Sequence, residues 1–230
     1  MTGCPIRTDA RDTYWTWEHA SDVHELYRRR TLGQEEEMTA HSQAADLLAE
    51  RVKPGDTVLD AGCGSGIFYH SLVKRGIDVE YWGVDATASF IEMGREILPK
   101  FGLPSERLLH ATFDDIDGEV DHVICINVLS HIDNYHRPLE RFLKMARKSV
   151  ILRESMKHGG QYQYLPDRHL DEGADLSVHV NHYDLDEVRA FIVDHGFNSR
   201  LVTDEHTGGE PYKSIDYLHY WSFLVADRKA

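Results

Sequence analysis

Residues 57–72 read TVLDAGCGSGIFYHSL, and this stretch restricts the fold more than any other part of the chain. A short apolar run ends in Asp60, glycines follow at the alternate positions Gly62, Gly64 and Gly66, and a helix-like apolar pattern begins directly after them. Glycine accepts left-handed backbone and lets a ligand approach the chain closely, and the start of a helix leaves amides unpaired. The stretch therefore predicts a buried strand, a ligand-binding turn and a helix in succession.

Short apolar runs and helix-period segments alternate along much of the remaining chain. Further strands are expected at 79–86, 107–112, 122–127 and 149–154. Two late runs, 199–206 and 216–227, have no helix between them, which predicts an antiparallel pair. The alternation is typical of a doubly wound α/β fold, in which helices cover both faces of a mainly parallel sheet.

Three helix boundaries can be predicted from local signals. A helix is expected over 35–50, where apolar residues have helical spacing. Ser89 and Glu92 have the spacing of a capping box, and so do Asp184 and Glu187. In such a box the two side chains satisfy amides at the start of the helix, so helices are expected to begin at both places.

Two regions depart from the alternation of strands and helices. Residues 1–50 are expected to form an N-terminal helical lid on a main domain that spans 51–230. Within that domain the polar segment 156–183 has no clear period and is rich in tyrosine and histidine. Loops with aromatic and titratable side chains on a rigid sheet are typical functional material, so this segment is expected to be a cap insertion.

Composition restricts the partners. The 230 residues suit one domain with a modest appendage, and no apolar run is long enough to span a bilayer. The formal net charge of −14 disfavours a nucleic-acid partner, which would require a basic stripe. Three cysteines without a CxxC motif, and an N-terminus without an apolar signal core, favour the reducing cytoplasm. A small-molecule partner is expected, with a monomer and a homodimer both left open.

The glycine turn distinguishes between three classes of ligand site. A P-loop requires a Gly-Lys-Ser/Thr ending, which is missing. A dinucleotide site requires G-x-G-x-x-G, but Ile67 stands where the third glycine belongs, and Gly66 comes one residue early. The remaining pattern, D-x-G-x-G-x-G, resembles the first motif of the class I S-adenosylmethionine-dependent methyltransferases.

This resemblance implies a cofactor, a fold and a set of site residues. The cofactor would be S-adenosylmethionine, and the Rossmann-like sheet would have seven strands, with an antiparallel last strand. Asp85 would accept hydrogen bonds from the ribose hydroxyls, and Asp114 or Asp115 would bind the adenine amino group. The cofactor-binding residues implied in this way are Asp60, Gly62, Cys63, Gly64, Gly66, Asp85, Ala86, Phe113, Asp114, Asp115, Asn127 and Val128, with Tyr27 and Arg30 as lid residues.

The acceptor side is less sharply defined by the sequence. His131 occupies the place of the histidine in a VLxH pattern that is frequent in this superfamily, and it is the candidate catalytic base, with a structural role as the alternative. The candidate acceptor-pocket residues are Tyr14, Trp17, Tyr162, Tyr164, His179 and His182. His169, Asp171, His179 and His182 share one irregular stretch, but their spacing matches no zinc motif, so no metal is expected.

Together these observations predict an S-adenosylmethionine-dependent methyltransferase that acts in small-molecule biosynthesis. The methyl group would pass to an oxygen or nitrogen of a small metabolite by in-line displacement. Two alternatives stay open at this point. The first is a binding module that holds the cofactor without turnover, and the second is a methyltransferase that acts on a protein or tRNA.

Overall fold

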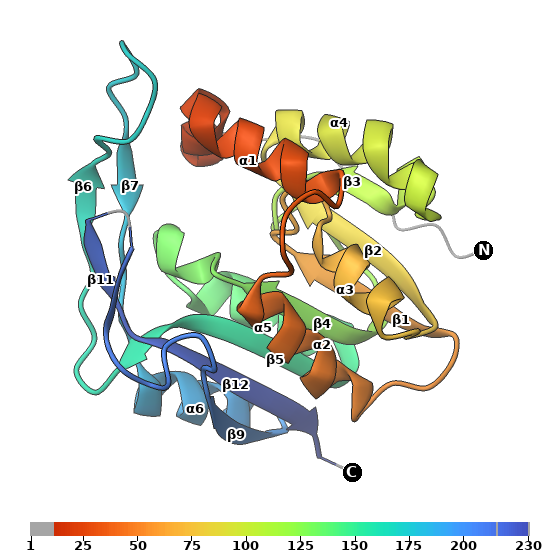
Figure 1. The fold of residues 1–230 in the computed structure, drawn as a ribbon. Coiled ribbons are helices and arrows are strands. Elements are labelled where there is room, and N and C mark those ends of the chain that lie inside the picture. Colours follow the sequence, from red (N-terminus) through yellow and green to blue (C-terminus); the bar gives the residue numbers. More distant parts are fainter. Residues whose placement is uncertain (1–11, 215, 230) are drawn as a thin grey trace.

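Strand β1 (Asp56–Ala61) lies inside the main sheet of the molecule, which is shown in Figure 1. The computed structural model describes residues 12–214 and 216–229, with side chains from residue 16 onward. β1 pairs in parallel with β2 (Val79–Asp85) on one side and with β4 (Val120–Ile126) on the other. Its residues from Val58 to Ala61 are buried, as expected of an apolar strand that is covered on both faces.

The main sheet has the strand order β3-β2-β1-β4-β5-β12-β9. The other strands on this path are β3 (Leu108–His110), β5 (Ala146–Lys157), β9 (Phe197–Thr203) and β12 (Trp221–Arg228). β12 runs antiparallel to both of its neighbours, so the predicted sheet with an antiparallel last strand is confirmed. The short strand β8 (Tyr183–Asp184) adds a further parallel pairing at the end of β5.

Helices cover both faces of this sheet (Figure 1), as predicted. The helices on one face are α2 (Thr39–Ala49), α3 (Phe68–Lys74) and α4 (Ala88–Ile97), and those on the other are α5 (His136–Met145) and α6 (Leu185–Asp194). Each face has its own apolar core. Leu48 and Phe68 belong to the first core, whereas Phe142 and Ile192 belong to the second.

The helix starts differ in part from the sequence prediction. The helix expected over 35–50 begins only at Thr39. The capping box predicted at Ser89 is wrong, because Thr87 is the N-cap of α4 and no side chain caps that helix. The amide of Ser89 instead donates to Oε1 of Glu18 at 3.1 Å. At α6 the predicted cap is confirmed, since the Asp184 side chain accepts from two amides of the first turn.

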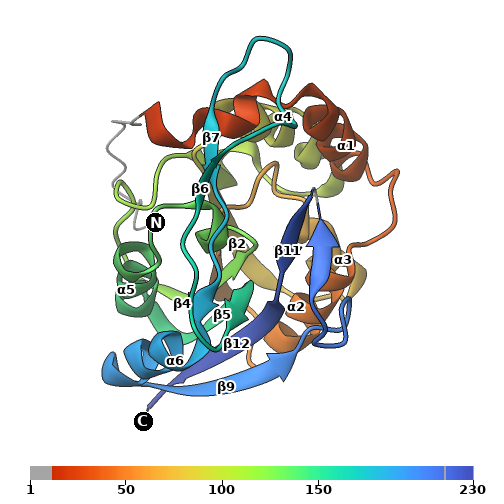
Figure 2. The ribbon, with the colours of Figure 1, turned by 90° about the vertical axis from the view of Figure 1, so that its left-hand side faces the viewer.

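Two hairpins lie beyond the carboxyl ends of the strands. The segment 156–183, expected to be irregular, contains β6 (Tyr164–Pro166) and β7 (Ser177–His179), which pair antiparallel. β10 (Tyr212–Ser214) and β11 (Tyr217–His219) form a second antiparallel pair. Strands of three residues are too short for a visible alternation of apolar and polar residues. Both hairpins lie on the same side of the molecule (Figures 1 and 2).

The N-terminal elements lie over the same edge of the sheet. A 3₁₀ helix, η1 (Asp12–His19), leads into α1 (Ser21–Thr31), and α1 packs on α4. Three further short 3₁₀ helices are η2 (Leu98–Phe101), η3 (Ser105–Arg107) and η4 (Leu129–His131). The chain order of the strands reverses between β1 and β4, and in sheets of this kind ligands bind beyond the strand ends at such a reversal.

Candidate active site

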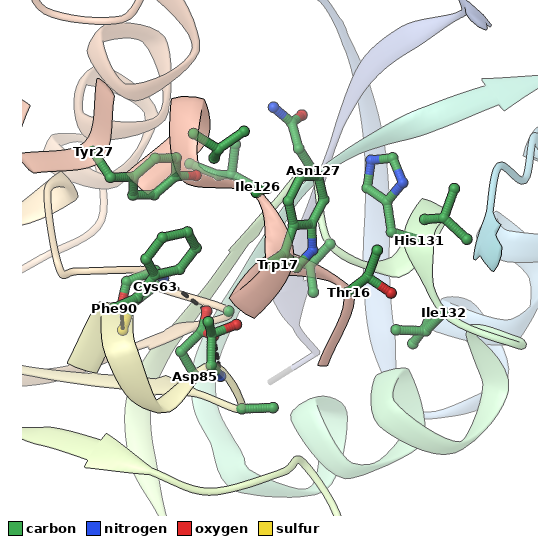
Figure 3. A pocket seen from close by; sticks show the side chains of 18 of the residues that line it. Thr16, Trp17, Tyr27, Cys63, Asp85, Phe90, Ile126, Asn127, His131 and Ile132 are labelled. Atoms are coloured by element: carbon green, nitrogen blue, oxygen red, sulfur yellow. Dashed lines mark hydrogen bonds between the residues drawn. The ribbon is translucent and has the colours of Figure 1, made fainter. Parts of the chain in front are cut away.

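A cavity of about 470 Å³ opens at this reversal of strand order, as Figure 3 shows from close by. Its wall combines residues from the turns after β1, β2 and β4, from α1, and from both hairpins. The volume lies within the range that is typical of small-molecule sites. Segments far apart in the sequence therefore meet around one space.

The glycine turn forms one end of the cavity wall. The amides of Gly62 and Cys63 both donate to the carbonyl of Val84 in β2, at 2.8 and 3.0 Å. Gly62 and Gly64 line the cavity and have positive φ, and a Cβ on Gly64 would lie 2.5 Å from Cε1 of Tyr27. Gly66 does not line the cavity, and its missing Cβ makes room for Leu108 and Leu98 instead.

Asp85 connects the glycine turn to the end of β2. Its carboxylate accepts from the amide of Gly64 and from the amide of Thr87, both at 2.8 Å. Burial raises the pKa of this carboxyl, while the two amides act in the opposite direction. Because each carboxylate oxygen has two lone pairs, Asp85 keeps acceptor capacity for a ligand in the cavity.

Asp60 lines the same end of the cavity, but its carboxylate is already bonded to a buried side chain of the protein. Its Oδ2 accepts a hydrogen bond from the hydroxyl of Tyr81 at 2.7 Å. Burial raises the pKa of Asp60 to about 7, with a smaller contribution from the charge of Asp85. Two buried acids with raised pKa values thus lie at neighbouring strand ends.

α1 contributes the predicted lid residues. The ring of Tyr27 stacks on Phe90 with centroids 4.5 Å apart and an angle of 7° between the planes. Burial is the main cause that raises the pKa of Tyr27 to about 12, so this phenol stays protonated at neutral pH. Arg30, one turn further along α1, also lines the cavity.

The end of β4 is held in an unusual backbone conformation. Asn127 has a φ of 59°, which a non-glycine residue rarely adopts. Its side-chain oxygen accepts from the guanidinium of Arg153. The neighbouring turn is fixed by Glu154, whose buried carboxylate accepts from the amides of Val128, Leu129 and Ser130 at 2.9 Å each. These contacts fix the turn that carries His131.

His131 points into the cavity from η4 (Figure 3). Its Nδ1 lies 3.1 Å from the carbonyl oxygen of His179, and only a protonated nitrogen can donate to that oxygen. In the neutral ring, Nε2 therefore carries the lone pair. Burial lowers the pKa of His131, so the neutral ring is the form expected at neutral pH. An imidazole with a free lone pair can accept a proton from a bound group.

Several other predicted site residues also meet at this cavity. Cys63, Ala86, Phe113 and Val128 line it on the cofactor side, and Trp17, Tyr164 and His179 line it on the acceptor side. The ring of Trp17 meets His131 edge-on, with centroids 5.9 Å apart. The lid and the cap segment therefore reach the same space as the strand ends.

Other predicted site residues lie away from the cavity wall. Asp114 pairs with Arg137 at 3.1 Å, and Asp115 accepts from the hydroxyl of Thr112 at 2.7 Å, so the structure does not bring either acid to the wall. Their adenine contact stays a prediction.

Some of the residues predicted to line the acceptor pocket also lie away from the cavity wall. Tyr162 is half exposed outside the wall, and His182 is buried beside Ser155, its Nδ1 2.8 Å from the Ser155 hydroxyl. The side chain of Tyr14 lies outside the described residues. The four residues considered for a metal do not converge, since His169 faces Asp216 whereas Asp171 accepts from Ser21.

The sequence prediction missed several rings in the cavity wall, among them Phe90, His219 and Trp221. Phe90 follows the β2 turn, and its place at the start of an amphipathic helix made it look like a core residue. His219 and Trp221 flank the start of β12, where they continue a strand pattern. The pairing of β10 with β11, which the sequence did not indicate, brings His219 and Trp221 to the cavity.

Comparison with known proteins agrees with this geometry. The fold is shared with solved structures of S-adenosylmethionine-dependent methyltransferases. The crystal structure of magnesium protoporphyrin IX methyltransferase from Synechocystis PCC 6803 with bound S-adenosylhomocysteine superposes with a TM-score of 0.60 at 18% sequence identity, over 93% of this chain and 98% of that one. Residues 59–152 match the family model described as a methyltransferase domain, which agrees with the predicted resemblance.

Curated relatives are similar to this chain over the same region. Chloroplastic magnesium protoporphyrin IX methyltransferase of Arabidopsis thaliana is 33% identical over 111 residues, which is 46% of this chain and 35% of that protein. Ribosomal protein L11 methyltransferase of Thermosipho africanus is 29% identical over 101 residues, 44% of this chain and 38% of that protein. The matched region thus spans little more than a third of each relative. Within the described residues, no helix is long and apolar enough to cross a membrane.

Proposed function

We propose that this chain is an S-adenosylmethionine-dependent methyltransferase that methylates an oxygen or nitrogen of a small metabolite. One observation carries the proposal. A single cavity joins the glycine turn and Asp85 at one end to His131, Trp17 and the hairpins at the other. A cofactor end and an acceptor end in one space meet the basic requirement of direct group transfer.

The residues present fit the cofactor. Gly62 and Gly64 line the cavity with bare backbone, and Val128 and Tyr27 pack so close to them that a Cβ would lie 2.3 Å from Val128 or 2.5 Å from Tyr27. Asp85 offers carboxylate oxygens suited to ribose hydroxyls, and Asn127 offers a polar side chain at the end of β4. Under this proposal Tyr27 and Arg30 close over the cofactor, with the N-terminal lid and the cap at 156–183 as the covering parts.

The chemistry assigned to this chain is positioning and proton transfer. The bound cofactor supplies a methyl group on a positively charged sulfur. Nε2 of His131 would accept the proton of an acceptor hydroxyl as that oxygen takes up the methyl group, and the ring would then hold the proton as an imidazolium. The acceptor would leave as a methyl ether. A neutral amine acceptor would lose its proton after transfer in the same way.

The histidines and aromatic rings of the acceptor end favour an uncharged molecule, and Asp167 adds one carboxylate to the same wall. Burial lowers the pKa values of His131 and His179, so both rings are neutral at pH 7. Trp17 and Tyr164 add aromatic surface. A relative named for methylation of a porphyrin supports a small acceptor, whereas the relative named for ribosomal protein L11 supports a protein acceptor as the second candidate. The proposed setting is the cytoplasm, with no nucleic-acid partner.

A turnover assay tests the proposal. Purified protein is incubated with methyl-labelled S-adenosylmethionine and panels of phenols, alcohols and amines, with ribosomal protein L11 included as a macromolecular acceptor. We expect S-adenosylhomocysteine and a methylated small molecule in equal amounts, and much less of both in the Asp85→Ala protein at a cofactor concentration near the wild-type Kd. Label on L11 alone would favour the second candidate. Tight cofactor binding without any product would indicate a binding module instead.

A further inference from the structure

His219 is a buried side chain in the wall of the cavity that the mechanism above does not use. It ends β11, and it is only 3% exposed. Its backbone position is set by the pairing of β11 with β10, where His219 lies opposite Tyr212. The second hairpin therefore brings this ring to the acceptor end of the site.

One ring nitrogen of His219 is without a hydrogen bond inside the described part of the chain. Nδ1 is completely buried and has no partner. Other buried histidines of this protein are bonded. His122 meets Ser149 through Nδ1 at 2.8 Å and Asp56 through Nε2 at 3.1 Å, and His182 meets Ser155 at 2.8 Å. A buried polar atom without a partner is uncommon and calls for an explanation.

The surroundings hold the ring in place and keep it uncharged. His219 stacks on Trp221 with centroids 4.4 Å apart and 10° between the planes, and Arg153 lies 4.7 Å from the centre of the same Trp221 ring. Burial is the main cause that lowers the pKa of His219 to about 3, and the neighbouring His131, His182 and Arg153 act in the same direction. A fixed neutral imidazole has one donor and one acceptor nitrogen to offer.

His219 also adjoins the candidate base. The centroids of the His131 and His219 rings are 6.2 Å apart, and the planes meet at 67°. The two rings come from η4 and β11, which are separated by more than a third of the chain but meet at one end of the cavity. A molecule placed with a hydroxyl at His131 would have its next polar group within reach of His219.

We propose that His219 is a specificity-determining residue of the acceptor site, which hydrogen-bonds a polar group of an uncharged hydroxylated acceptor beside the group that faces His131. This inference rests on the proposed function and deepens it. It predicts that analogues without the second polar group bind less well, because the His219 ring in the cavity wall then lacks that hydrogen-bond partner.

Nitrogen NMR of the histidine rings tests the contact directly. Protein labelled with ¹⁵N in histidine is saturated with S-adenosylhomocysteine and titrated with catechol, which has two adjacent hydroxyls, and in a parallel experiment with phenol, which lacks the second hydroxyl. Catechol is expected to shift the ring nitrogens of both His131 and His219, and phenol is expected to leave the His219 nitrogens in place. Catechol that shifts His131 alone, or neither ring, would overturn the inference.

Kinetics with an acceptor found in the turnover assay give a second, independent test. His219→Phe keeps an aromatic ring without nitrogens, and we expect its acceptor KM to rise at least tenfold, with kcat within a fewfold and unchanged affinity for S-adenosylhomocysteine. His219→Gln restores a polar side chain and should recover part of that loss. His206→Phe is the matched control, since His206 is an exposed residue outside the cavity wall.

The outcomes separate this inference from the proposed function. An acceptor KM that is unchanged in His219→Phe would overturn the role of His219 and leave the methyltransferase proposal intact. Loss of S-adenosylhomocysteine binding in both His219 variants would show a structural role and overturn the inference as well. Wild-type protein that does not bind S-adenosylhomocysteine would overturn the proposed function, and the role of His219 with it.

Discussion

Arg153 and Asp204 form a buried ion pair in which Nε of the arginine lies 2.5 Å from Oδ1 of the aspartate. Arg153 is 3% exposed and Asp204 is completely buried. The same guanidinium donates to the side chain of Asn127 and lies over Trp221. The pair therefore connects the end of β4, where Asn127 faces the cavity, with the loop after β9.

We expect a large loss of folding stability when the ion pair between Arg153 and Asp204 is broken. Asp204→Ala leaves the Arg153 charge buried without its partner, and such a change costs about 3–5 kcal/mol. Urea denaturation measures it, with Arg29→Ala as the control, because Arg29 pairs with Glu35 on the surface and its loss should change little. If the double variant Arg153→Met/Asp204→Leu is no more stable than Asp204→Ala, the uncompensated charge is not the cause.

The contact between Gly64 and Tyr27 predicts a specific effect on cofactor binding. Gly64→Ala places a Cβ 2.5 Å from Cε1 of Tyr27 and adds left-handed strain, whereas Gly55→Ala adds comparable strain with no atom within 4 Å. Both variants should lose about 1–2 kcal/mol of stability. Only Gly64→Ala should bind S-adenosylhomocysteine at least tenfold more weakly, about 1.4 kcal/mol, by calorimetry. Equal affinities in the two variants would contradict the assignment of this turn to the cofactor.

If Nε2 of His131 is the proton acceptor, replacing His131 should lower turnover without changing cofactor binding. His131→Ala removes the nitrogen that accepts the acceptor proton, so turnover should fall by about 10²-fold or more, with unchanged affinity for S-adenosylhomocysteine. The measurement is the initial rate of S-adenosylhomocysteine formation with an alcohol or phenol acceptor. A lower melting temperature with normal turnover would instead support the structural alternative for this residue.

The protonation of Asp60 predicts a pH dependence of stability. Burial raises the folded-state pKa of Asp60 to about 7, and the unfolded value is about 3.9. Between these values the folded chain holds a proton that the unfolded chain releases, so this residue's contribution is present in full below about pH 4 and is lost as the pH rises to 7.

Urea denaturation of wild type and Asp60→Asn between pH 4 and 7 isolates this contribution. The asparagine cannot titrate, so the stability of the wild type relative to the variant should decline steadily with rising pH. Histidines with lowered pKa values act in the opposite direction in both proteins, and their effect cancels in the difference. A difference that is flat or that increases with pH would show that Asp60 is ionised in the folded protein.

Much of the sheet could be predicted from the sequence, because its strands are apolar runs with clear boundaries. The glycine turn, Asp85 and Asn127 were found because each lies at the end of such a run, and the carboxyl ends of parallel strands meet at one edge. The Asp184 cap was found from local spacing alone. The cap predicted at Ser89 failed because the competing residue Thr87 lies two positions earlier at the strand end.

The acceptor side could not be predicted to the same extent. It depends on two hairpins of three-residue strands, which leave no periodic signal, and on contacts between distant segments. His219 was missed because it looks like part of a strand, whereas His182 was proposed although its ring bonds to Ser155 away from the cavity wall. Asp114 and Asp115 adjoin the site in sequence, yet their carboxylates turn to Arg137 and Thr112.

Calorimetric titration of the purified protein with S-adenosylmethionine, and separately with NAD, tests the central claim most directly. We predict binding with a Kd on the order of micromolar for the first ligand and no binding of the second. Asp85→Ala should bind S-adenosylmethionine more weakly by about 1.5–3 kcal/mol, because the ribose hydroxyls lose a charged acceptor. Binding of NAD alone would contradict the account, because it would assign the glycine turn to a dinucleotide and the chain to a different class of enzyme.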